Sequence, residues 1–147
     1  MCLIPKRRFQ FLEHTADIYI AAYGKTLEEA FENAALATFQ SMTDTDRIAP
    51  QIEEELEVDG FDEKALLYNW IEALIIKFET TYRVYSEFEV TSLSRVGKNY
   101  HLCARIRGEK FDSAKHPPKV GIKAVTYHQM EIIRGSEYVT VKFILDI

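Results

Sequence analysis

The hydrophobic periodicity of the chain changes once, near Val84, and this change constrains the fold more than any other feature of the sequence. Before it, apolar residues follow helical spacing in two long stretches, residues 26–42 and 63–82. After it, they recur at every second position, which is typical of strands, and the last two strands are expected at 122–133 and 138–144. Four consecutive strands after two helices favour an antiparallel or mixed sheet with the helices on one side.

Three further strands are expected ahead of and between the helices, at residues 8–12, 17–23 and 51–58. Both faces of 17–23 are apolar, which indicates a central strand. The glutamates within 51–58 indicate an edge strand, because charge there discourages wrong pairing. The predicted order is β-β-α-β-α-β-β-β-β. We therefore expect an α+β fold in which a mixed, largely antiparallel sheet carries two main helices.

Each predicted helix begins at a residue suited to cap it. Thr26-Leu-Glu-Glu29 is a capping-box pattern, in which the threonine side chain accepts from the N3 amide and Glu29 reaches back. Asp62 can cap the second helix. Apolar residues cover more than half of the circumference of that second helix, which predicts that it is deeply buried between a sheet and another element.

The length of the chain and its composition, with 47% hydrophobic and 28% charged residues, predict one folded domain over residues 1–147. The net charge of -5 is unlike that of a general nucleic-acid binder, which is usually basic. Cys2 and Cys103 offer no metal spacing and no disulfide framework, so both are expected as free thiols in a reducing compartment. No signal peptide and no run of ~20 apolar residues is present, so the expected location is cytoplasmic, away from membranes.

Two carboxylates stand at predicted strand ends, Asp17 before the first long strand and Asp146 after the last. They converge if those strands are neighbours, and the terminal carboxylate of Ile147 would then be a third oxygen donor. Oxygen ligands suit Ca²⁺, Mg²⁺ or Mn²⁺. The alternative is that Asp17 caps a turn and Asp146 is a solvated tail residue. His14 could ligate or act as a base near neutral pH, or it could hydrogen-bond a loop.

A basic segment in the last third of the chain is a further candidate. Lys123-Ala-Val-Thr-Tyr-His128 alternates, which puts Lys123, Val125 and Tyr127 on one face. Other basic residues precede it: Arg105, Arg107, Lys110, Lys115, His116 and Lys119. Clustered lysines and arginines suit phosphate groups, and a solvated loop is the alternative.

Five segments, in order along nearly the whole chain, together resemble the archease family. They are Phe11-Leu-Glu-His-Thr-Ala-Asp17, Gly24-Lys-Thr-Leu-Glu-Glu-Ala-Phe31, Leu66-Leu67 with Trp70, Lys123-Ala-Val-Thr-Tyr-His128 and Ile144-Leu-Asp-Ile147. The His-Thr-Ala-Asp element and the Leu-Asp-Ile ending are specific as a pair, whereas each alone is a weak signal.

The resemblance implies a small cytosolic accessory protein of the RtcB-type RNA ligase, which joins 3′-phosphate or 2′,3′-cyclic phosphate ends to 5′-hydroxyl ends in tRNA splicing and RNA repair. Such a protein promotes guanylylation and multiple turnover of the ligase, is not itself an enzyme, and contacts RNA only indirectly. Carried over by motif, Asp17 and Asp146 would bind a divalent metal ion, with the Ile147 carboxylate as a third ligand. Lys123 matches a functional lysine, and His14 belongs to the motif as a partner or phosphate contact.

Two other functions stay open. The resemblance also admits a chaperone-like partner of a tRNA methyltransferase. A small metal-dependent hydrolase would use Asp17 and Asp146, with His14 as its base. The chain has no Walker A loop, no His-Glu-x-x-His, no Cys-x-x-Cys and no nucleophile-elbow serine, which agrees better with an accessory role than with an enzyme.

Overall fold

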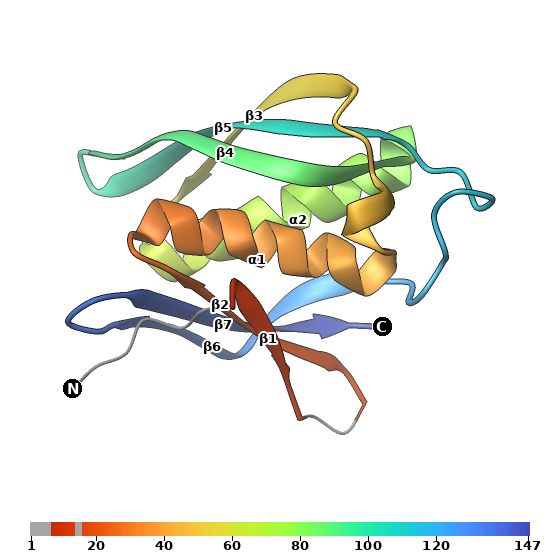
Figure 1. The fold of residues 1–147 in the computed structure, drawn as a ribbon. Helices are drawn as coiled ribbons and strands as arrows, with labels where there is room; N and C mark the ends of the chain where they lie inside the picture. The colour runs from red at the N-terminus through yellow and green to blue at the C-terminus, as the bar shows by residue number, and fades with distance from the viewer. Residues whose placement is uncertain (1–6, 14–15) are drawn as a thin grey trace.

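Two antiparallel β-sheets enclose two α-helices in the computed structural model of the chain, which describes residues 7–13 and 16–147 (Figure 1). The elements, in chain order, are β1 (Phe9–Leu12), β2 (Ile18–Gly24), α1 (Leu27–Met42), a short 3-10 helix η1 (Thr45–Arg47), β3 (Ile52–Gly60), α2 (Glu63–Thr81), β4 (Arg83–Val96), β5 (Asn99–Lys110), β6 (Ala124–Arg134) and β7 (Val139–Asp146). The predicted α+β class and the predicted order of helices and strands are confirmed.

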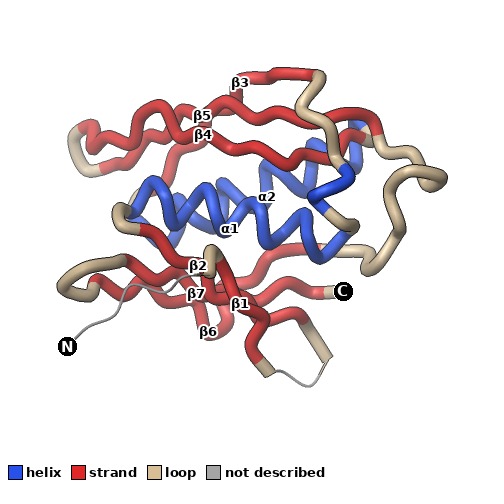
Figure 2. Tube along the Cα trace, in the orientation of Figure 1, coloured by secondary structure: helices blue, strands red, loops and turns tan. Residues whose placement is uncertain are grey.

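The strands divide between two sheets, whereas the sequence pointed to one. One sheet has the order β1-β2-β7-β6 and the other has the order β3-β5-β4, and every pairing is antiparallel. As predicted, β2 is a central strand and β3 an edge strand. The helices form a layer between the sheets (Figure 2). A helix that is apolar around more than half of its circumference needs cover from two sides, which a single sheet does not supply.

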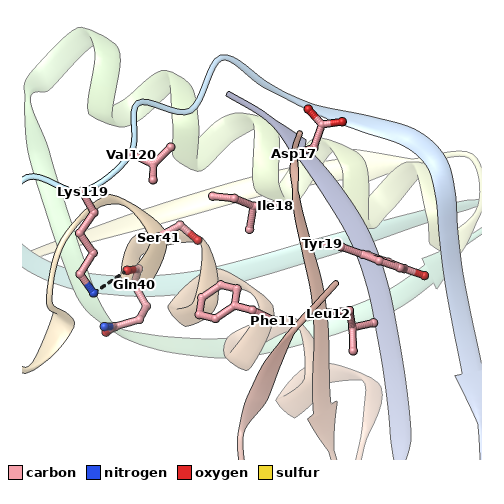
Figure 3. Close-up of a pocket in the computed structure, with 9 residues that line it drawn as sticks. All are labelled: Phe11, Leu12, Asp17, Ile18, Tyr19, Gln40, Ser41, Lys119 and Val120. Carbon is pink, nitrogen blue, oxygen red and sulfur yellow. Dashed lines mark hydrogen bonds between the residues drawn. The ribbon is translucent and has the colours of Figure 1, made fainter. Parts of the chain in front are cut away.

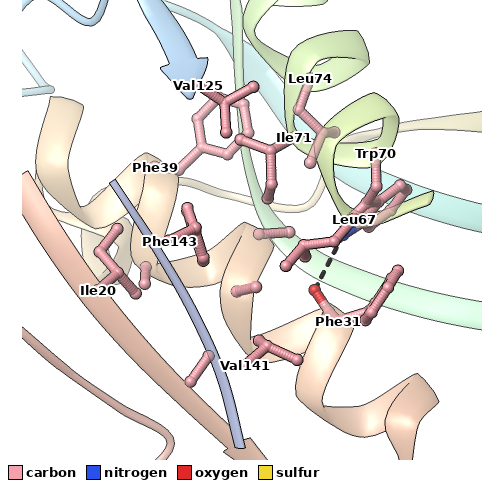
Figure 4. Packing of buried hydrophobic residues seen from close by; sticks show 14 of the residues in the cluster. Ile20, Phe31, Phe39, Leu67, Trp70, Ile71, Leu74, Val125, Val141 and Phe143 are labelled. Atoms are coloured by element: carbon pink, nitrogen blue, oxygen red, sulfur yellow. Dashed lines mark hydrogen bonds between the residues drawn. The ribbon is translucent and has the colours of Figure 1, made fainter. Parts of the chain in front are cut away.

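The core lies where the helix layer meets each sheet. Trp70 and Ile71 of α2 are completely buried, as are Phe31 of α1 and Phe143 of β7. Figure 4 shows these side chains gathered around the two helices, with Phe143 on the side of β7, and Trp70 also packs against Phe88 of β4 in the other sheet. The indole Nε1 of Trp70 donates a hydrogen bond to the carbonyl oxygen of Phe31 at 2.9 Å, so this side chain joins the two helices directly.

The same local unit occurs twice in the chain. In each case a strand ends at a glycine, one spacer residue follows, and the next residue caps the helix. In the first unit Gly24 ends β2, and the Thr26 side chain accepts a hydrogen bond from the amide of Glu29 at 3.1 Å. In the second, Gly60 ends β3, and Asp62 accepts from the amide of Ala65 at 2.7 Å. Both predicted caps are therefore confirmed.

The alternation predicted from residue 123 to residue 128 is interrupted. β6 pairs with β7 as far as Thr126 opposite Ile144, and the pairing resumes only at Glu131 opposite Lys142. Gln129 has a φ of 56°, in the left-handed region, so the backbone leaves the regular strand path here. Only the first part of this segment has the regular strand geometry that the sequence predicts. In the part of the chain that the structure describes, no helix has the length and apolar character needed to cross a membrane.

Candidate functional site

The pairing of β2 with β7 brings Asp17 and Asp146 to the same end of one sheet. Ile18 stands opposite Leu145, and the register continues antiparallel along both strands. The next residues outward from this pair are Asp17 and Asp146, and both are half-buried. Two acids separated by most of the chain are therefore neighbours, as the sequence prediction of adjacent first and last strands required.

Lys123 and Ile147 lie at the same end of the sheet. The amide of Lys123 donates a hydrogen bond to the carbonyl oxygen of Asp146 at 2.8 Å, and the next residue, Ala124, pairs with Asp146 across the two strands. Ile147 follows directly, and its side chain is exposed, as is that of Lys123. Four of the five predicted site residues thus converge, whereas His14 lies outside the described residues.

A cavity of about 300 Å³ opens beside Asp17. Its walls come from β1, β2, the last turn of α1 and the loop before β6: Phe11, Leu12, Asp17, Ile18, Tyr19, Gln40, Ser41, Lys119 and Val120. Figure 3 shows the Asp17 carboxylate at one edge of this group and the Lys119 ammonium at another, where it donates a hydrogen bond to the Gln40 carbonyl oxygen. The cavity is mostly apolar, with a few polar groups at its edges, which is a common composition for a binding site.

The loop that precedes β6, residues 111–123, is fastened to the end of α1. The amide of Lys119 donates to the carbonyl oxygen of Met42 at 2.9 Å, and the amide of Val120 donates to that of Ser41 at 3.2 Å. These carbonyl groups belong to the last turn of the helix, where intrahelical partners are lacking. The loop therefore satisfies the helix end and carries the chain directly to Lys123.

A second anchor of this loop is the carboxylate of Glu109, whose side chain is 12% exposed. The ring of His116 accepts the amide hydrogen of Asp112 at Nδ1, so its proton lies on Nε2 and is donated to Glu109 at 2.9 Å. Lys115 and the amide of Ala49 also donate to Glu109. Burial raises the pKa of Glu109, but the hydrogen bonds from Lys115, Ala49 and His116 outweigh this effect and lower its pKa to about 2.

Acid should therefore weaken this anchor. Because the folded-state pKa of Glu109 lies below its ordinary value of 4.5, its contribution to stability is complete above about pH 4.5 and is lost as the pH falls toward about 2. We expect Glu109→Gln to lower the free energy of unfolding at pH 7 by about 2 kcal/mol, since it removes hydrogen bonds to a charged group. Denaturant unfolding at a series of pH values measures this, and a difference from wild type that persists undiminished below pH 2 would contradict the assignment.

Most of the predicted basic segment is already paired within the protein. Arg107 contacts three glutamates of the neighbouring strands, at 2.8 Å for Glu53, 3.6 Å for Glu87 and 3.4 Å for Glu89. Lys115 pairs with Glu109 at 2.7 Å. Since these cations are neutralised on the protein itself, they offer little to a phosphate group. Lys123 is the basic residue that lies beside Asp146 at the end of the sheet, and it is the candidate for an external partner.

One group of potential ligands was missed in the sequence. Glu57 of β3 and His101 and Cys103 of β5 bring a carboxylate oxygen, a ring nitrogen and a sulfur within 4.8 Å of one another on the other sheet. Cys103 was expected to be a free thiol, because the spacing of the two cysteines alone does not indicate a metal site. The sequence pattern that could have indicated this group is His-x-Cys on one predicted strand and Glu-x-Asp on another. Alternate residues of a strand lie on the same face, so each pair presents both side chains together.

Comparison with known proteins gives one consistent result. The Archease protein family (MTH1598/TM1083) matches residues 9–147. The chain is 44% identical to Protein archease of Sulfurisphaera tokodaii over 141 residues, which cover 96% of this chain and 99% of that protein. It is 44% identical to Protein archease of Pyrococcus furiosus over 128 residues, covering 87% of this chain and 89% of that protein.

Two solved structures share the fold. The solution structure of a Methanobacterium thermoautotrophicum protein superposes with a TM-score of 0.84 at 36% sequence identity, covering 95% of this chain and 99% of that one. The crystal structure of an archease from Thermotoga maritima, described as a possible chaperone, gives a TM-score of 0.55 at 22% identity, covering 94% of this chain and 96% of that one. At that identity, the second similarity concerns the fold alone.

Proposed function

The chain belongs to the archease family, and we propose that it is a metal-binding accessory protein of an RtcB-type RNA ligase, which it activates by promoting guanylylation and multiple turnover. The observation that supports this proposal is the register of β2 with β7, which makes Asp17 and Asp146 neighbours. Without that adjacency, acids at the two ends of the chain could not bind one ion.

The chemistry of these donors fits a hard divalent cation. Asp17, Asp146 and the terminal carboxylate of Ile147 offer only oxygen atoms, and oxygen donors suit Ca²⁺, Mg²⁺ or Mn²⁺. A bound cation would supply positive charge for the phosphate groups of the nucleotide at the ligase. The acids of this chain would hold the ion, and the sheet end would present it at the surface.

Lys123 is the proposed contact with the partner. Its side chain is exposed, and its backbone is held beside Asp146 by a hydrogen bond. A lysine in this position can bind a phosphate group or a carboxylate of the ligase. His14, in the same motif as Asp17, is proposed as a second contact. The chain itself need not transform any substrate in this mechanism.

The test is multiple-turnover RNA ligation with GTP, a divalent metal and a limiting amount of the cognate ligase. We expect the wild-type chain to stimulate turnover, and Asp17→Asn or Asp146→Asn to lose that stimulation and to bind the metal about tenfold more weakly, because one anionic ligand is missing. Calorimetric titration with Ca²⁺, Mg²⁺ and Mn²⁺ measures the affinity. Addition of one glycine after Ile147 should also weaken binding, since it displaces the terminal carboxylate.

The matched control is Glu137→Gln, an exposed acid in the β6–β7 turn at the opposite end of the same sheet, which should change neither property. No stimulation by the wild-type chain with any of the three metals would contradict the proposal. Stimulation that survives in Asp17→Asn would separate the accessory role from the acidic site and favour a chaperone-like role. Phosphate-ester hydrolysis by the isolated chain, lost in Asp17→Asn, would favour the hydrolase instead.

A further inference from the structure

The β3-β5-β4 sheet carries a row of acidic residues along β3 on its outer face, and the residues of β5 opposite them change along the strand. Each acid of β3 on this face stands opposite one residue of β5: Glu53 opposite Arg107, Glu55 opposite Arg105, Glu57 opposite Cys103 and Asp59 opposite His101. The first two acids therefore face arginines, which are always charged. The last two face a thiol and an imidazole, so this end of the row has no permanent cation opposite it.

The three ligand atoms at that end form a nearly equilateral triangle. The Cys103 Sγ lies 3.2 Å from Glu57 Oε1 and 3.4 Å from His101 Nε2, and this nitrogen lies 3.4 Å from Glu57 Oε1. Zinc bonds of their usual lengths, arranged tetrahedrally, require separations of about 3.3–3.6 Å between an oxygen, a nitrogen and a sulfur ligand. All three separations lie within about 0.3 Å of these values, a difference that side-chain rotation can absorb without movement of the backbone.

Asp59 directs the imidazole toward this triangle. Its carboxylate is hydrogen-bonded to Nδ1 of His101, so that the other ring nitrogen, Nε2, is turned toward Cys103 and Glu57. A carboxylate behind the ligating histidine is the usual arrangement in zinc proteins, because it sets the tautomer and the orientation of the ring. Four residues on two paired strands thus provide three ligands and the group that orients one of them.

We propose that Glu57, His101 and Cys103 form a binding site for a borderline-soft divalent transition metal ion, with Zn²⁺ as the preferred occupant. Sulfur and nitrogen donors select Zn²⁺ over Ca²⁺ and Mg²⁺, so this site differs in kind from the all-oxygen site at Asp17 and Asp146. The two sites lie on different sheets, with the helix layer between them (Figure 1).

Three protein ligands leave a fourth position for water or for a group from outside. The side chain of Glu57 is 67% exposed and that of His101 is 32% exposed, so this position faces solvent. Binding requires the thiolate, so the proton of Cys103 leaves to solvent when the ion enters. The site is open in the way that exchangeable or catalytic zinc sites are, rather than closed like a structural zinc site.

The test uses Co²⁺ as a coloured substitute for Zn²⁺, in a Cys2→Ser background so that Cys103 is the sole thiol. We expect one Co²⁺ per chain at this site, with a sulfur-to-cobalt charge-transfer band and the strong visible bands of four-coordinate cobalt, all lost when Zn²⁺ displaces the cobalt. Cys103→Ser should abolish the charge-transfer band. His101→Gln should weaken binding at least tenfold, and Asp59→Asn by roughly 10–100-fold, the usual loss when the group behind a ligand is removed.

Glu55→Gln is the matched control, because Glu55 lies on the same face of β3, two residues from Glu57, and stands opposite an arginine. It should leave Co²⁺ binding unchanged. Zn²⁺ should also raise the melting temperature of the Cys2→Ser chain more than that of the Cys103→Ser variant. The proposal would be overturned if the charge-transfer band survived Cys103→Ser, or if the band did not appear saturably in the Cys2→Ser chain. A loss of binding in Glu55→Gln as large as that in His101→Gln would also overturn it. Asp17→Asn should bind Zn²⁺ normally, which separates this result from that for the proposed function.

Discussion

Trp70→Ala is expected to lower the free energy of unfolding by about 4 kcal/mol, the largest effect we predict for a single side chain. Trp70 is completely buried, and its ring packs edge to face against Phe88 at a centroid distance of 6.5 Å. Its indole nitrogen also donates to the Phe31 carbonyl oxygen of the other helix at 2.9 Å (Figure 4). The change therefore removes apolar contacts on the sheet side and a direct link between the helices.

Denaturant unfolding followed by circular dichroism measures this effect, because Trp70 is the sole tryptophan and fluorescence would be lost with it. Trp70→Phe keeps most of the apolar volume and loses the hydrogen bond, so it should fall between wild type and Trp70→Ala. Phe61→Ala is the control: that aromatic side chain is 72% exposed and its removal should change stability by less than about 0.5 kcal/mol. Equal losses in Trp70→Ala and Phe61→Ala would contradict this account of the helix layer.

The elements could be predicted from the sequence because each depends on a local pattern. Capping at Thr26 and Asp62 depends on residues within one turn of the cap, and alternation within a strand depends on neighbours two positions apart. The division into two sheets could not be predicted in this way, since it depends on which strands pair across long separations. The break in β6 was also invisible, because residues 127–130 keep a sequence typical of a strand while their pairing is interrupted.

The two clusters differ in what their prediction required. For Asp17 and Asp146 it was enough to suppose that the first long strand and the last strand are neighbours, and the register confirms that they are. For Glu57 and His101, which are 44 residues apart, the exact register of β3 against β5 was needed. A shift of one residue would turn one set of side chains to the other face, so composition and spacing could not identify this group.

Gly24→Ala and Gly60→Ala are each expected to lower the free energy of unfolding by about 3 kcal/mol, because a methyl group would meet backbone atoms that cannot move independently. A Cβ at Gly24 would lie 2.3 Å from the amide nitrogen of Ala30, and one at Gly60 would lie 2.4 Å from that of Leu66. In both units the clash is with the first turns of the helix that the glycine precedes. The strand would have to move away from its helix to relieve this clash. The loss of stability would therefore include other contacts between the strand and the helix.

Gly121→Ala is the matched control, because a Cβ there would meet no atom of the described residues within 4 Å. It should leave stability unchanged or raise it by about 0.5 kcal/mol through a less flexible unfolded chain. Chemical denaturation of the three variants measures the contrast. Gly24→Ala should in addition weaken metal binding at Asp17, since that acid directly precedes β2, whereas Gly60→Ala should weaken Zn²⁺ binding at Glu57 of β3. Losses at Gly24 and Gly60 no larger than at Gly121 would mean that strand and helix can separate at little cost, and that the repeated unit does not hold either site in place.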